Sequence, residues 1–95
     1  MVFADKATED IWDGLDSKVA RKALPSNLHG VGRRRLLAIN AATCLADLGS
    51  PPGNKLEALT GDRDGQHAIR INDKYRICFR WSDDGCSEVE ITDYH

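Results

Sequence analysis

The sequence predicts an α+β fold in which N-terminal helices pack on one face of a small, mostly antiparallel β-sheet. In the first half of the 95-residue chain, apolar residues recur at three- and four-residue steps, as in amphipathic helices. In the last third, apolar and polar residues alternate, as in half-buried strands. With 41% hydrophobic residues the chain can bury one modest core, so we expect a single domain over residues 1–95.

The helical part is expected over about residues 7–48. Thr8 is a suitable N-cap for a short first helix, which Gly14 ends. A second helical stretch begins near Ser17 and stops before Pro25.

The longest helix is expected over residues 28–48, where apolar side chains keep helical spacing up to Leu48. Three consecutive arginines, Arg33, Arg34 and Arg35, surround its first turns. Such a run most often forms a solvated helix face, and an interaction surface is the alternative.

A loop rich in Gly and Pro is expected over residues 49–58, between the helical part and a strand meander over about residues 66–94. The alternating pattern predicts three strands, at 66–72, 75–81 and 88–94. Turn-forming residues lie between them. Val2 and Phe3 form an apolar entry that can add an edge strand.

The outward face of this predicted sheet collects Arg70, Arg76 and Arg80 from neighbouring strands. Guanidinium groups present planar forks of donors, so two or three of them together make a cradle for phosphate oxygens. The alternative is that these arginines pair with Glu88 and Glu90 across the strands.

Overall charge and cysteine content restrict the function. The net charge of -2 argues against a general nucleic-acid binder, although residues 61–80 are locally basic and residues 81–95 contain no Lys or Arg. The three cysteines have no CxxC spacing, so neither a disulfide framework nor a zinc site is expected. We find no signal peptide or membrane-spanning run, which predicts a cytoplasmic protein with reduced thiols and no membrane partner.

Several blocks of the sequence together resemble the HigB group of bacterial toxins in the RelE/ParE superfamily. They are ATEDIWDG (7–14), PPGNKLEAL (51–59), LTGDR (59–63), IRINDKYRICFRW (69–81) and VEITDYH (89–95). The resemblance covers nearly the whole chain and implies a small α+β toxin. It also implies a ribosome-dependent endoribonuclease that cuts mRNA in the ribosomal A site without a metal or other cofactor.

The same resemblance implies the partners of the protein. They are the 70S ribosome with its mRNA, and a HigA-type helix-turn-helix antitoxin whose gene follows the toxin gene. The toxin–antitoxin complex represses its own operon, so operator DNA is contacted only through the antitoxin.

Carried over residue by residue, the resemblance places catalytic roles on Arg70, Arg76, Asp93, Tyr94 and His95. The arginines would stabilise negative charge on phosphorus, and His95 would transfer a proton near neutral pH. Asp93 would act as a base or orient the imidazole, and Tyr94 would stack on a base or bond the phosphate. Alternation alone turns Asp93 and His95 away from the arginine face, so we expect the terminus to be ordered and to curl toward it.

One family position departs from the pattern, because Thr60 replaces the lysine of a Leu-Lys-Gly-Asp motif. A threonine supplies no charge to a phosphate. Lys55, Arg63 and Lys74 are candidates to compensate, and with Arg80 they form the expected RNA- and phosphate-binding set.

Two other functions stay open at this point. The ParE branch of the superfamily poisons DNA gyrase by binding and cuts no RNA. A weakened toxin can also act mainly as an antitoxin-binding co-repressor. For the ribonuclease, Arg33, Arg34 and Arg35 are hypothetical ribosome contacts.

Overall fold

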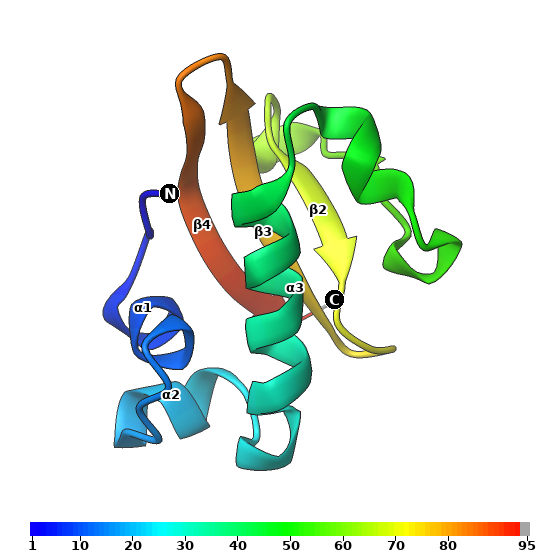
Figure 1. Ribbon diagram of the computed structural model, residues 1–95. Coiled ribbons are helices and arrows are strands. Elements are labelled where there is room, and N and C mark those ends of the chain that lie inside the picture. The colour runs from blue at the N-terminus through cyan, green and yellow to red at the C-terminus, as the bar shows by residue number, and fades with distance from the viewer. Residues whose placement is uncertain (94–95) are drawn as a thin grey trace.

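A computed structural model describes residues 1–93 and confirms the α+β class (Figure 1). The described part of the chain contains three α-helices, α1 (Lys6–Trp12), α2 (Lys18–Ala23) and α3 (His29–Ala41). Its antiparallel sheet has the order β1-β2-β3-β4. The strands are β1 (Glu57–Ala58), β2 (His67–Arg70), β3 (Tyr75–Ser82) and β4 (Gly85–Asp93). Helix α3 crosses one face of the sheet, and α1 and α2 pack beside it (Figure 1).

The first helix starts earlier than predicted, because Asp5 and not Thr8 is its N-cap. The Asp5 carboxylate accepts a hydrogen bond from the Thr8 backbone N–H at 2.8 Å. Thr8 is buried one turn later, and its hydroxyl accepts a 3.1 Å bond from the Ile91 N–H of β4. The predicted start of the second helix near Ser17 is confirmed, and the Ser17 hydroxyl caps α2 by accepting a hydrogen bond from the Ala20 N–H at 3.2 Å.

Helix α3 ends at Ala41, so the prediction of a helix to Leu48 was wrong. The Asp47 carboxylate accepts bonds from the Thr43 N–H and hydroxyl, both at 3.0 Å, and holds the chain in a tight turn. A short 3₁₀ helix, Leu45–Gly49, follows and buries Leu48. Apolar spacing of three residues suits a 3₁₀ turn as well as an α-helix, which explains the error.

The predicted loop 49–58 was partly wrong, because it contains strand β1. Glu57 pairs with Ala68, and Ala58 pairs with His67. Two residues are too few for alternation to be visible in the sequence. At the opposite edge, the expected strand at Val2 and Phe3 is reduced to a single parallel bridge between Phe3 and Val89.

A bulge in β4 decides which of its residues enter the core. Cys78 pairs with Glu90 but Arg80 pairs with Ser87, so Glu88 and Val89 together face the single residue between Cys78 and Arg80. Glu88 has φ of 52°, which accommodates the extra residue. The extra residue shifts the inward positions of β4 by one, so Cys86 and not Ser87 belongs to the core.

The core lies between the helices and the sheet and includes both aromatic and branched side chains. Its fully buried members include Ile11, Leu36, Ile69, Ile77, Phe79 and Val89. The outward sheet face is not uniformly open, because Cys78 and Ala68 are buried there too. The exposed positions of that face therefore concentrate at the ends of the strands.

Asp10 ties α1 to α2. Its carboxylate accepts a 2.6 Å hydrogen bond from the Ser17 hydroxyl and lies 3.0 Å from the Lys6 ammonium. The bond from Ser17 and the neighbouring Lys6 lower the pKa of Asp10 below its ordinary value of 3.8. A lowered pKa adds stability that is present above this value and is lost as pH falls below it.

Asp10→Asn is therefore expected to lower the denaturant midpoint at pH 7, and the difference from the parent protein should shrink as the pH falls below 3.8. Urea unfolding followed by circular dichroism at several pH values measures this. Asp13→Asn, at the exposed C-cap of α1, is the matched control and should change the midpoint little. A pH-independent loss in Asp10→Asn would contradict the linkage.

Candidate functional site

Arg70 and Arg76 are directly opposite each other on β2 and β3. Opposite residues of an antiparallel pair present their side chains on the same face. The neighbouring pair, Ile69 and Ile77, is buried in the core, so the two arginines lie on the face turned away from the helices. The structure thus brings together the two arginines that the sequence singled out.

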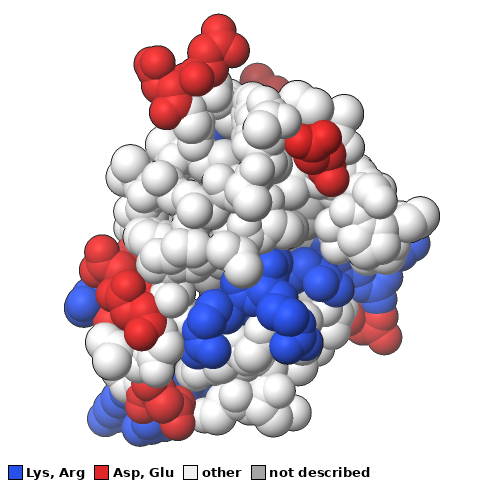
Figure 2. Space-filling model, in the orientation of Figure 1, with Lys and Arg blue, Asp and Glu red and all other residues white. Residues whose placement is uncertain are grey.

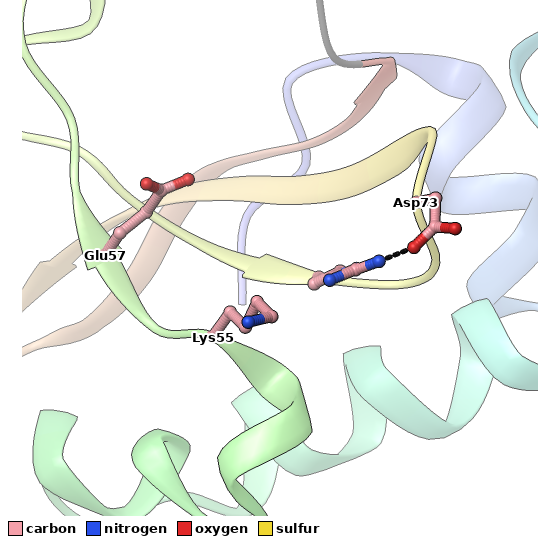
Figure 3. A pocket seen from close by; sticks show the side chains of 4 residues that line it. Lys55, Glu57 and Asp73 are labelled. Carbon is pink, nitrogen blue, oxygen red and sulfur yellow. Dashed lines mark ion pairs between the residues drawn. The ribbon is translucent and has the colours of Figure 1, made fainter.

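Both guanidinium groups are held by neighbours. Arg70 donates from Nε to the Asn72 carbonyl at 3.0 Å and pairs with the Asp73 carboxylate (Figure 3). Arg76 Nη1 lies 3.5 Å from the Glu57 carboxylate. The arginines are therefore oriented before any substrate arrives.

The alternative interpretation, pairing with Glu88 or Glu90 across the strands, holds for Arg80, and Arg63, which precedes the β2 strand, also has a glutamate partner. Arg80 pairs with Glu88 and Arg63 lies 3.1 Å from Glu90. Ion pairs at such partly exposed positions contribute only ~0–1 kcal/mol each. A polyanionic ligand with several phosphates can therefore exchange for these carboxylates.

Two open hollows lie along this face, and among residues 1–93 they share one lining residue. The first, of about 520 Å³, is lined by Lys55, Glu57, Arg70 and Asp73 (Figure 3). The second, of about 460 Å³, includes Glu57, Thr60, Arg63 and Arg76. In Figure 3, Glu57 projects from β1 while Asp73 comes from the turn between β2 and β3. Glu57 is thus the common wall of both hollows.

Sequence reasoning missed Glu57, because it assigned residues 49–58 to a loop. Pairing with Ala68 places Glu57 on the same sheet face as Cys78 and the two arginines. In the sequence, Glu57 is distinguished only by its position between Lys55 and Thr60. That position points to the candidate site only once strand β1 is known.

Thr60 lies where the family lysine is expected and lines the second hollow beside Arg63 and Arg76. Of the three candidates to replace the missing charge, Arg63 shares this hollow and Lys55 lines the other. Lys74 is not among the residues that line either hollow, and its ammonium lies 5.5 Å from the centre of the Tyr75 ring. Arg63 is therefore the nearest substitute for the lysine.

At the C-terminal end of β4, Thr92 is opposite Arg76 and Asp93 is opposite Tyr75. Tyr75 packs against the core, so the register assigns Asp93 to the helix side of the sheet. The bulge lies upstream, at Glu88, and does not reverse this assignment. The predicted curl concerns Tyr94 and His95, which lie outside the described residues.

The three consecutive arginines of α3 do not form one solvated face. Arg33 donates from Nε to the Ile11 carbonyl at the end of α1, at 3.0 Å. Arg35 donates from Nε to the Arg70 carbonyl at 3.3 Å. Arg34 is exposed. Two of the three thus tie α3 to its neighbours, and Arg35 supports the backbone of Arg70.

Comparison with known proteins agrees with this architecture. The family model described as "RelE-like toxin of type II toxin-antitoxin system HigB" matches residues 1–95. The chain belongs to the HigB family of RelE-like toxins. Membership of a HigB-type system implies a cognate antitoxin for this chain.

Two relatives are similar to this chain over most of its length. The chain is 37% identical over 81 residues to Toxin HigB-1 of Vibrio cholerae serotype O1, covering 85% of this chain and 82% of that toxin. It is 38% identical over 68 residues to an uncharacterized protein of Haemophilus influenzae, covering 72% of this chain and 67% of that protein.

Within residues 1–93, no helix has the length and apolar character needed to cross a membrane. The same residues contain no group of three or more His, Cys, Asp or Glu side chains placed to hold a metal ion.

Proposed function

We propose that this HigB-family toxin is a ribosome-dependent endoribonuclease that cleaves mRNA in the A site and thereby blocks translation. The observation that carries the proposal is the cross-strand pair of Arg70 and Arg76, which flanks the carboxylate of Glu57 in two adjoining hollows. Fixed cations beside a proton acceptor are the groups that cleavage of an RNA phosphodiester requires.

The reaction uses the RNA as its own nucleophile. The 2′-oxygen loses its proton and forms a bond to phosphorus, while the bond from phosphorus to the 5′-oxygen breaks. The products are a 2′,3′-cyclic phosphate and a 5′-hydroxyl. Negative charge grows on the phosphoryl oxygens during this exchange, and Arg70 and Arg76 are oriented to stabilise it.

Two protons must move, and two groups are assigned to them. Glu57 takes the proton from the 2′-hydroxyl, because its carboxylate lies 3.5 Å from Arg76 Nη1 and lines both hollows. The family resemblance makes His95 a proton-transfer group without fixing its direction; with Glu57 as the base, His95 would deliver a proton to the 5′-oxygen and Asp93 would orient its imidazole. Tyr94 would stack on a base or bond the phosphate.

The remaining basic residues extend the binding surface. Lys55 and Arg63 each line one hollow and would contact phosphates on either side of the cleaved bond. Lys74, in the turn just before β3, and Arg80, on β3, would extend the phosphate-binding surface. The toxin acts in the cytoplasm on the 70S ribosome, and a HigA-type antitoxin blocks it and links the complex to operator DNA.

The proposal is tested by adding purified toxin to a translation reaction with programmed ribosomes and mapping the ends of the mRNA. We expect cuts in the A-site codon, and none on free mRNA or with His95→Gln. Intact message together with inhibited gyrase would support the ParE-type alternative. If the message stays intact and gyrase is not inhibited, the antitoxin-binding co-repressor is the remaining function.

A further inference from the structure

Positive charge is strongly segregated along the chain. Residues 17–46 contain six of the thirteen Lys and Arg residues and none of the fifteen Asp and Glu residues. This stretch forms α2 and α3, the outer layer of the molecule. Figure 2 shows basic side chains gathered over the middle and lower part of this helical face. The six are Lys18, Arg21, Lys22, Arg33, Arg34 and Arg35.

These cations differ from those of the candidate site in how they are neutralised. Among residues 1–93, Arg21 alone of the six has a carboxylate partner, Asp16 at 3.7 Å. By contrast, Arg63, Arg70, Arg76 and Arg80, at or beside the outward sheet face, each pair with a carboxylate of the chain. The arginines of that face are therefore neutralised locally, whereas most cations of the helical face are not.

The exposed side of α3 combines this charge with an apolar side chain. Arg34 and Leu37 are three residues apart, so they are neighbours on the helix surface. Leu37 is 56% exposed, although the adjacent Leu36 is fully buried. Gly30 and Ala41 continue the same side of the helix with minimal bulk, and both are exposed. Arg34 and Leu37 are therefore the two large side chains on this exposed side of the helix, one cationic and one apolar.

We infer that the outer side of α3, centred on Arg34 and Leu37, binds an acidic amphipathic segment of the cognate antitoxin. The apolar side of that segment would cover Leu37, and its carboxylates would pair with Arg34. Residues 17–46 carry positive charge and no acidic residue, so an acidic partner is complementary to them. The exposed Leu37 favours a partner segment that also has an apolar side.

This surface is less suited to RNA than to an acidic protein segment. RNA binding draws on several phosphate contacts and on aromatic stacking. Arg33 and Arg35 donate to backbone carbonyls, which leaves Arg34 as the outward cation of the run. Helix α3 also contains no Phe, Tyr or Trp.

The docking surface lies on the opposite layer from Glu57 and the arginine pair, so its occupant leaves both hollows uncovered. The inference goes beyond the proposed function, because it concerns binding of the antitoxin and holds whether or not the toxin cuts RNA.

The test measures antitoxin affinity by calorimetry with purified toxin variants and the purified cognate antitoxin. Arg34→Glu and Leu37→Ser should each weaken binding by at least about tenfold. Lys22→Glu is the matched control, because Lys22 is also exposed and unpaired within residues 1–93 but lies on α2. It changes the net charge as Arg34→Glu does and should retain parental affinity.

Circular dichroism and thermal melting establish that all three variants fold. Parental antitoxin affinity in both α3 variants would overturn the inference, as would equal losses in Arg34→Glu and Lys22→Glu. Loss of ribosome co-sedimentation with unchanged antitoxin binding would assign the surface to RNA instead. Cleavage assays on the same variants report separately on the proposed nuclease.

Discussion

Replacing Arg76 with alanine should lower the rate of mRNA cleavage on the ribosome by roughly 10²–10³-fold, the usual effect of removing one preorganised donor from a developing anion. Arg76 is positioned for this role by its place opposite Arg70 and by the Glu57 carboxylate 3.5 Å from its Nη1. The loss should appear in kcat, since the charge that Arg76 meets is greatest in the transition state.

Single-turnover cleavage of mRNA in programmed ribosomes measures this rate. Arg80→Ala is the matched comparison, because it removes the same charge from the same strand and face. Arg80 pairs with Glu88 and lines neither hollow, so this change should raise KM and leave kcat unchanged. Equal losses of kcat in the two variants would show that this face acts only through its total charge.

Glu57→Gln should have the second large effect, lowering kcat by about 10²–10⁴-fold while tightening RNA binding. Cleavage should become slower and RNA binding tighter for one physical reason. The carboxylate accepts the 2′-hydroxyl proton during cleavage, but in the free protein it competes with phosphate for Arg76. Glutamine keeps the shape and removes both the basicity and the competing charge.

Cleavage rate and the Kd for a short RNA, measured on the same samples, separate these contributions. Asp73→Asn is the control, because Asp73 also lines the first hollow and pairs with its arginine, Arg70. It should tighten RNA binding without the loss of kcat. Faster cleavage by Glu57→Gln would mean that the carboxylate restrains the site, and its assignment as the base would be withdrawn.

The sheet could be predicted well where strands are long enough to show alternation. The β3 pattern from Tyr75 to Trp81 identified its inward side chains, and the pairing of Arg70 with Arg76 follows from the turn between them. Strand β1 could not be predicted, because two residues carry no period. The end of α3 was missed because Asp47 stops the helix by bonding backbone N–H groups, which leaves the apolar spacing unchanged.

The candidate site was predicted only in part, for a related reason. Arg70 and Arg76 stand out in the sequence as cations on adjacent strands. Glu57 reaches them through β1, a contact between residues far apart in the chain. The functions of Arg33 and Arg35 were equally hidden, since their partners are backbone carbonyls, which every residue possesses.

The separation of charge between the two layers gives the molecule an electric dipole. In the field of a polyanion such as the ribosome, a free toxin turns its helical layer forward, although its arginine pair lies on the other side. An acidic antitoxin segment on α3, as inferred above, would cancel that orientation and make the whole particle more negative. It would then keep the toxin away from RNA by long-range repulsion at low ionic strength, without covering the arginine pair.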